Sequence, residues 1–253
     1  MMSTLPGTTG RRRIYLMRHG HVDYLAAEVV RTRNTHQVPL TPRGRMEAQA
    51  AGRALSHVAL DRAICSGLPR TRQTAELVLA QLAESPTLET EPELVEIQGG
   101  RPRGLITSRK ELIATMSFHF ARAGEEGATM MDGGEAFALC QARAVSAITS
   151  LLTAPDWRQI LIVAHEGVNR LVLSWAAGAS LGAAAAFEQD TGCINVLDFD
   201  MVPGASGHPL PEIERVLIKA VNLTPYNYVK HGMNLTSLEA IFDRDFAQEK
   251  LEW

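Results

Sequence analysis

Short apolar runs bounded by polar or turn-forming residues are the clearest pattern along this chain. Three of them, at 14–17, 63–65 and 160–164, are too short for helices. Runs of this kind are typical of buried β-strands. Two later stretches, 192–199 and 213–221, have a similar character and predict two further strands.

Helical patterns occupy the segments between these strands. Thr41 suits a helix N-cap and Pro42 suits the first turn, so a helix is predicted over 42–56. The other predicted helices cover 71–82, 135–152 and 167–177. Strands that alternate with helices predict an α/β fold, a three-layer sandwich with a central, mostly parallel sheet flanked by helices.

Length and composition agree with one globular domain: the chain has 253 residues, of which 45% are hydrophobic and 21% charged. We expect a disordered leader over 1–12 and a single domain over 13–253, with a helical lid insertion around 101–131. A formal net charge of −3 and the lack of a long apolar run argue against nucleic-acid and membrane partners. Three widely spaced cysteines without a CxxC pair indicate a reducing compartment, and we expect the cytoplasm.

Two histidines come directly after predicted strands. Arg18 and His19 follow the run 14–17, and His165 follows the run 160–164. A single histidine beside an arginine is more often a surface pair than a catalytic group. Open α/β sheets, however, bind ligands at the carboxyl ends of their strands, so two histidines in these places indicate a site.

An arginine-bearing loop lies between these histidines in sequence. Ser66 follows the strand 63–65, and Arg70 is expected in the loop that opens the next helix. Unpaired N–H groups at a helix start favour an anion, and the planar guanidinium of arginine suits phosphate. By itself the loop is equally well explained as an exposed helix cap.

Taken together, these segments resemble the histidine phosphatase superfamily, the group that includes cofactor-dependent phosphoglycerate mutases. The resemblance extends from about residue 13 to 199. The motifs that carry it are Leu16-Met17-Arg18-His19-Gly20, Pro39-Leu40-Thr41 with Gly44 and Gln49-Ala50, Cys65-Ser66-Gly67-Leu68-Pro69-Arg70 with Gln73-Thr74-Ala75, Leu94-Val95-Glu96, Gly133-Gly134-Glu135, and Ala164-His165-Glu166-Gly167-Val168-Asn169-Arg170.

The resemblance implies a phosphoglycerate mutase-like fold and a nucleophile at His19, which takes the phosphoryl group. It implies that Arg18 and Arg70 grip the phosphoryl oxygens. Ser66 and Gly20 are expected beside them at the substrate. Two arginines and imidazole groups supply the positive charge that phosphoryl transfer requires without a metal ion.

Two further catalytic residues are implied by the same resemblance. His165 is expected to support charge on the phosphoryl group, and Glu96 to protonate the leaving oxygen. Glu91 and Glu93 lie close by in sequence, and a solvent-exposed acid is the alternative for Glu96. Glu166 stands where the family commonly has Gly, and it either raises the pKa of His165 or points to solvent.

The chain also departs from the family where polar residues commonly help to bind phosphate. These positions hold His21, Val22 and Leu25. The loop residues that could take their place are Arg33, Asn34 and Thr35. The departures leave the expected chemistry intact and put the substrate in doubt.

The sequence therefore predicts a metal-independent phosphatase that hydrolyses small phosphomonoesters through a phosphohistidine, with no cofactor and no metal. The alternatives are a phosphoglycerate mutase-type phosphotransferase and a weakly active regulatory module that binds a phosphate ligand. The expected partner is a small phosphorylated metabolite, and association into a homodimer is left open.

Overall fold

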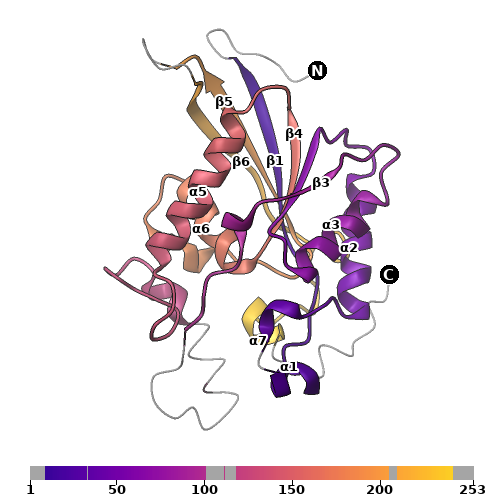
Figure 1. Cartoon of the computed structure of the whole chain (residues 1–253), viewed down its shortest axis with the longest axis vertical. Helices are drawn as coiled ribbons and strands as arrows, with labels where there is room; N and C mark the ends of the chain where they lie inside the picture. The colour runs from indigo at the N-terminus through magenta and orange to yellow at the C-terminus, as the bar shows by residue number, and fades with distance from the viewer. Residues whose placement is uncertain (1–8, 33, 101–110, 112–117, 205–209, 242–253) are drawn as a thin grey trace.

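Six strands form one sheet in a computed structural model that describes residues 9–32, 34–100, 111, 118–204 and 210–241 (Figure 1). The strands are β1 (Gly10–Arg18), β2 (Arg62–Cys65), β3 (Leu88–Thr90), β4 (Gln159–Ala164), β5 (Ile194–Val202) and β6 (Glu212–Leu223), in the order β3-β2-β4-β1-β5-β6. The pairs β1–β4, β4–β2 and β2–β3 are parallel, whereas β1–β5 and β5–β6 are antiparallel. Among the described strands only β5 opposes the rest, so the expected mostly parallel sheet is confirmed.

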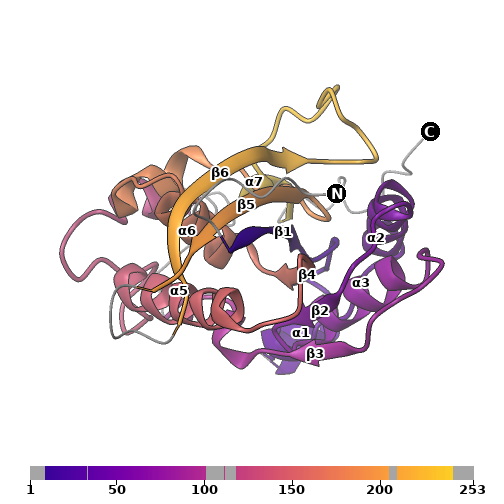
Figure 2. The ribbon, with the colours of Figure 1, turned by 90° about the horizontal axis from the view of Figure 1, so that it is seen from above.

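Helices cover both faces of this sheet, as Figures 1 and 2 show. They are α2 (Pro42–Leu55) and α3 (Pro69–Leu79) on one face, and α5 (Phe137–Thr153) and α6 (Glu166–Ala176) on the other. Because successive side chains of a strand point to opposite faces, β1 serves two cores. Tyr15 and Met17 pack in the cluster with α2 and α3, while Ile14 and Leu16 pack in the cluster with α5 and α6. The predicted three-layer fold is confirmed.

Shorter elements surround the carboxyl edge of the sheet. They are α1 (Ala27–Thr32), the single-turn 3-10 helices η1 (Thr35–Gln37), η2 (Pro92–Leu94) and η3 (Phe120–Arg122), the longer 3-10 helix η4 (Leu181–Ala186), and α7 (Ser237–Ile241). Of the helical lid predicted around 101–131, residues 101–110 and 112–117 lie outside the described residues. The remainder contains α-helical residues at 111 and 118–119, the 3-10 helix η3, and turns.

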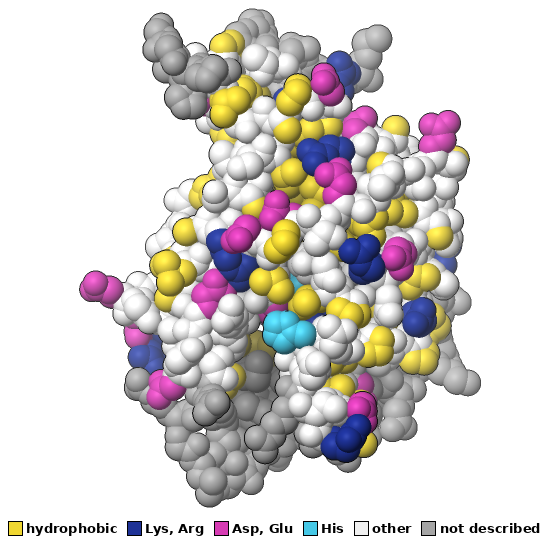
Figure 3. Space-filling model, in the orientation of Figure 1, with side chains coloured by type: hydrophobic (Ala, Val, Ile, Leu, Met, Phe, Trp, Pro, Cys, Tyr) yellow, Lys and Arg dark blue, Asp and Glu magenta, His cyan; other side chains and the backbone are white. Residues whose placement is uncertain are grey.

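The surface carries charge of both signs. On the face in Figure 3, Lys and Arg side chains lie among Asp and Glu side chains. Surface ion pairs such as Arg62–Glu89 (2.6 Å) and Arg122–Glu125 (2.7 Å) account for part of this mixture. Within the described part of the chain, no helix combines the length and the apolar character that crossing a bilayer requires.

The boundary predicted for the N-terminal leader is wrong, because β1 begins at Gly10 and not after residue 12. Two alternate arginines of this strand pair with aspartates of β5. Arg11 lies 2.7 Å from Asp200, and Arg13 lies 2.6 Å from Asp198. These ion pairs across the β1–β5 ladder extend the sheet into the arginine run, and residues 1–8 lie outside the described part.

Helix α3 begins two residues earlier than predicted. Pro69 occupies its first turn, where a missing N–H costs nothing, so Arg70 lies in that turn and not in a preceding loop. The predicted start of α2 is confirmed: Thr41 is the N-cap, and its hydroxyl accepts a hydrogen bond from the N–H of Gly44 at 3.1 Å.

A close approach of two glycines joins the turn after β1 to the first turn of α2. A Cβ added to Gly20 would lie 2.3 Å from the carbonyl oxygen of Gly44. A Cβ added to Gly44 would lie 2.2 Å from the carbonyl oxygen of His21. Both contacts involve backbone atoms, which cannot move aside without displacing the turn.

We expect Gly44→Ala to lower the free energy of unfolding by about 1–3 kcal/mol, as overpacking of a close contact does. Alanine is the better helix former by about 1 kcal/mol, so any loss measures the collision. Gly182→Ala is the control, because its Cβ would meet nothing closer than 3.8 Å. Urea unfolding of both variants checks this, and an unchanged midpoint for Gly44→Ala would contradict the account.

Candidate active site

The two histidines expected at the site meet at the carboxyl edge of the sheet. Strands β1 and β4 pair with Arg18 opposite Ala164, so His19 and His165 leave the sheet side by side. The N–H of His19 donates to the carbonyl of Ala164 at 3.1 Å, which extends the ladder by one residue. The imidazole centroids lie 5.2 Å apart, and both residues are buried.

A backbone carbonyl sets the tautomer of His19. Its Nδ1 lies 2.8 Å from the carbonyl oxygen of Gly20, which can only accept, so Nδ1 carries the proton. Nε2 therefore keeps its lone pair. Burial, reinforced by the positive charges of Arg70 and Arg18, lowers the pKa of His19 well below its ordinary value. The imidazole is consequently neutral, and the lone pair of Nε2 is available for reaction.

Arg70 lies directly against that nitrogen. Its Nε donates to Nε2 of His19 at 3.2 Å, and its Nη1 donates to the carbonyl of Thr35 at 3.0 Å. The guanidinium carbon also lies 5.8 Å from the centroid of the Tyr24 ring. Arg70 is buried, so its charge acts at short range on whatever occupies the space beside His19.

Arg18 forms an ion pair with the carboxylate of Glu166. Its Nη1 lies 2.9 Å from Oε2 of Glu166 and also donates to the carbonyl of Gln189. The residue is only 2% exposed. Its Nε is buried and has no hydrogen-bond partner within the described residues. A buried cationic donor without a partner is suited to an anionic ligand.

A chain of hydroxyls sets the tautomer of His165. The hydroxyl of Thr71 donates to the carbonyl of Leu68 at 2.9 Å, so the 3.0 Å bond between Ser66 and Thr71 uses the proton of Ser66. Nε2 of His165, 2.7 Å from Ser66 Oγ, must then be the donor. Nδ1 is buried and has no partner in the described part of the chain. A proton taken up at Nδ1 would face a bound anion.

Glu96 reaches the site from the loop after η2. Its carboxylate accepts from the N–H of Ile97 at 2.9 Å and from the N–H of Gly167 at 3.4 Å, at the start of α6. A Cβ on Gly167 would lie 2.6 Å from Glu96 Oε1, so glycine makes this approach possible. Burial raises the pKa of Glu96, and the charge of Glu166 raises it further, whereas Arg70 opposes the shift. These influences favour the protonated carboxyl of a general acid.

The structure thus brings together six of the seven predicted site residues as side chains around one point, and the seventh, Gly20, contributes backbone. Its N–H donates to the hydroxyl of Thr74 at 3.0 Å, and its carbonyl orients His19. The N–H of Gly20 is therefore occupied within the protein, and the residue acts by orienting His19. Ser66 likewise contacts His165 in this structure.

Of the three positions that depart from the family, His21 is buried with its N–H donating to Glu47 at 2.8 Å, whereas Val22 and Leu25 belong to a small apolar cluster. Val22 pairs with Leu40 through an isolated β-bridge, and Leu25 packs against the same cluster. Of the residues considered as replacements, Asn34 uses its side chain to cap η1, and Thr35 offers its carbonyl to Arg70. The third, Arg33, lies outside the described residues.

The alternative in which Glu166 points to solvent is wrong. The residue is buried, and its carboxylate faces Arg18 and Arg170 instead of solvent. The pKa of His165 is lowered, mainly by burial and then by Arg70. Glu166 and Arg170 are four residues apart on a predicted helix, and this spacing is typical of an ion pair. Nothing in the sequence marks Ser237, which donates to the same carboxylate at 2.7 Å.

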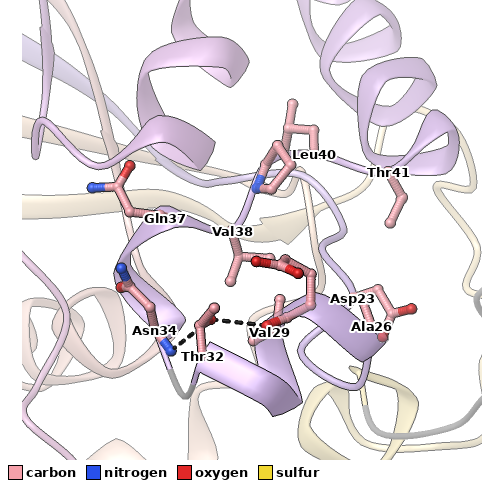
Figure 4. A pocket seen from close by; sticks show the side chains of 11 residues that line it. Asp23, Ala26, Val29, Thr32, Asn34, Gln37, Val38, Leu40 and Thr41 are labelled. Atoms are coloured by element: carbon pink, nitrogen blue, oxygen red, sulfur yellow. Dashed lines mark hydrogen bonds between the residues drawn. The ribbon is translucent and has the colours of Figure 1, made fainter.

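A pocket of about 470 Å³ lies next to the site, between α1, η1 and the start of α2 (Figure 4). Its wall includes Asp23, Val29, Asn34 and Leu40. None of the predicted site residues lines this pocket. Arg70 contacts this wall through the carbonyl of Thr35, which lies between the lining residues Asn34 and Gln37.

Comparison with known proteins agrees with this fold. The sequence model of the histidine phosphatase superfamily (branch 1) matches residues 14–202, and the chain belongs to that family. The adenosylcobalamin/alpha-ribazole phosphatase of Salmonella typhimurium is 29% identical over 192 residues, covering 74% of this chain and 90% of that protein. The acid phosphatase of Mycobacterium tuberculosis is 30% identical over 210 residues, covering 79% of this chain and 95% of that protein.

A solved structure of another phosphatase has a similar fold. The crystal structure of the alpha-ribazole phosphatase from Shigella flexneri superimposes with a TM-score of 0.61 at 27% identity, covering 83% of this chain and 96% of that one. Family membership and named phosphatase relatives support the predicted enzyme class, a phosphoric monoester hydrolase.

The low pKa of His19 can be tested by titration. Because burial and two cations disfavour the imidazolium, His19 should stay neutral as the pH falls through about 6.5, where an unperturbed imidazole takes up its proton. NMR of protein labelled at the histidine ring carbons measures this, with the signal assigned by its loss in His19→Gln. Titration of that signal at pH 6.5 or above would contradict the burial argument.

Proposed function

We propose that this protein hydrolyses small phosphomonoesters through a phosphohistidine at Nε2 of His19. One observation carries the proposal: the lone pair of that atom lies among Arg18, Arg70 and His165. Two buried polar atoms of this group, Arg18 Nε and His165 Nδ1, have no partner in the described residues. A phosphoryl group beside Nε2 would give Arg18 Nε the acceptor it lacks, and His165 would donate to the same group once it takes up a proton at Nδ1.

In the first step, Nε2 of His19 attacks phosphorus and the ester P–O bond breaks. The proton stays on Nδ1 and remains hydrogen-bonded to the carbonyl of Gly20, which stabilises the positive charge that develops on the ring. Arg70 exchanges its bond to Nε2 for the phosphoryl oxygens. Arg18 and Arg70 then neutralise the equatorial oxygens in a site that water hardly reaches, where each charge counts most.

Glu96 supplies the proton that the leaving alkoxide needs. In the second step its carboxylate accepts a proton from water as that water attacks phosphorus, and the P–N bond breaks. His19 regains the lone pair on Nε2, and phosphate is released. The sum of the two steps is one ester and one water converted to one alcohol and one phosphate.

The same residues make a metal ion unnecessary, since arginine and imidazole groups surround the transferring group. No cluster of three or more His, Cys, Asp or Glu side chains in the described ranges is arranged to hold one. The three cysteines are buried and free, which supports a reducing compartment such as the cytoplasm.

The role of Glu96 provides the test of this function. Glu96→Gln should slow hydrolysis of an alkyl phosphate by about 10²–10⁴-fold, the usual contribution of general acid catalysis. Hydrolysis of p-nitrophenyl phosphate, whose leaving oxygen hardly needs a proton, should slow far less. Both rates are measured with excess EDTA, in which the wild-type activity should persist.

Glu93→Gln is the matched control, since Glu93 is an exposed acid three residues earlier, in the 3-10 helix η2. It should leave both rates within twofold. Equal slowing of the two substrates in Glu96→Gln would assign Glu96 to binding. Rapid interconversion of labelled phosphoglycerates with little free phosphate would replace the phosphatase by the mutase.

A further inference from the structure

We propose that Glu166 is a positioning residue for Arg18 and that it joins the phosphate-binding arginine to the C-terminal helix α7. The inference rests on the proposed function, since it takes Arg18 to bind the phosphoryl group. It gives a role both to the acid at a position where glycine is common in the family and to a segment that lies beyond the family's match at residues 14–202.

Glu166 uses its two oxygens on two different sides. Oε2 forms an ion pair with Nη1 of Arg18 at 2.9 Å, without the geometry of a hydrogen bond, on the side of the catalytic site. Oε1 accepts from Nε and Nη2 of Arg170, at 3.0 and 2.8 Å, and from the hydroxyl of Ser237 at 2.7 Å. All four residues are at most 4% exposed. The carboxylate is therefore a bridge between the active site and α7.

This bridge restricts Arg18 in a specific way. Nη1 is held by Glu166 and by the carbonyl of Gln189, which leaves Nε as the donor without a partner. A guanidinium held by one edge presents its other atoms in a single orientation. Arg18 therefore loses little conformational entropy when it binds phosphate, because its rotamer is already fixed. This strengthens binding.

The C-terminal segment is itself anchored around the site. The N–H of Ser237 donates to Glu188 at 2.8 Å, and the hydroxyl of Tyr226 donates to the carbonyl of Thr191 at 2.7 Å. Lys230 pairs with Asp190 at 2.7 Å. The partners of these bonds all lie in the loop 188–191, whose Gln189 carbonyl also contacts Arg18. Helix α7 thus reaches Arg18 by two routes.

Three variants separate this role from general stability. Ser237→Ala removes the hydrogen bond from α7 and leaves the carboxylate. Glu166→Gln replaces one acceptor oxygen by a donor nitrogen, so it can satisfy only one of the two guanidiniums. Ser174→Ala is the control: it removes a buried serine of α6 whose hydroxyl donates at 2.6 Å to the carbonyl of Ser180, away from Arg18.

The measurements are the dissociation constant for vanadate by calorimetry, and kcat and KM for p-nitrophenyl phosphate. Ser237→Ala should raise the vanadate constant and KM by about threefold to tenfold, the effect of one lost hydrogen bond. Glu166→Gln should raise both by at least about tenfold, because a buried ion pair is broken. In Ser237→Ala kcat should change less than twofold, since a weaker grip on the phosphoryl group affects ground state and transition state alike. Ser174→Ala should leave all three values within twofold.

Vanadate affinity keeps this proposal separate from the proposed function. If wild-type protein binds vanadate but hydrolyses nothing, the proposed function fails, and the Glu166 proposal is still decided by the dissociation constants of the variants. Wild-type vanadate affinity and KM in folded Ser237→Ala would overturn it. So would an equal loss in Ser174→Ala, or a wild-type protein that binds no vanadate.

Discussion

The parallel pairing of β1 with β4 determines where every group of the site lies. These strands are neighbours in the sheet with Arg18 opposite Ala164, so the residues that follow them, His19 and His165, emerge side by side. Strand β2 on the far side of β4 brings Ser66 and the start of α3 to the same edge. A shift of one residue in the β1–β4 register would turn the histidines away from each other, because side chains alternate between the faces of a strand.

Once the site is assembled, burial and charge determine its chemistry. Arg18 and Arg70 are almost entirely removed from water, and their charges lower the pKa of both imidazoles, whose own burial acts in the same direction. The histidines are thereby kept neutral beside two cations. Glu166 offsets part of this positive charge through its ion pair with Arg18. The resulting positive charge favours the binding of an anion beside His19.

Much of this arrangement could be predicted from the sequence. The apolar run 14–17 ends at Arg18, and the run 160–164 ends at His165, so strand ends and site residues coincide. The start of α3 was placed too late because Pro69 permits a helix to begin where a loop was expected. Local patterns were likewise silent about β3, which is three residues long, and about the extension of β1, which depends on Asp198 and Asp200 far along the chain.

Contacts between distant segments set the limit of such prediction. Ser237 lies 71 residues from Glu166, and no periodicity or motif connects them. The tautomers of the histidines were equally hidden, since they depend on the carbonyl of Gly20 and on the hydroxyl of Thr71. The choice of Nε2 as the proposed nucleophile thus depends on the folded backbone and is the central claim of the proposed mechanism.

That choice can be measured directly by trapping the phosphoenzyme. Protein mixed rapidly with a phosphomonoester is quenched in alkali, in which phosphohistidine survives, and the modified residue and ring nitrogen are identified by mass spectrometry and ³¹P NMR. The account predicts phosphate on Nε2 of His19, at a level that falls as substrate is consumed. Phosphate on Nδ1, on another residue, or on none while substrate is being hydrolysed would contradict it.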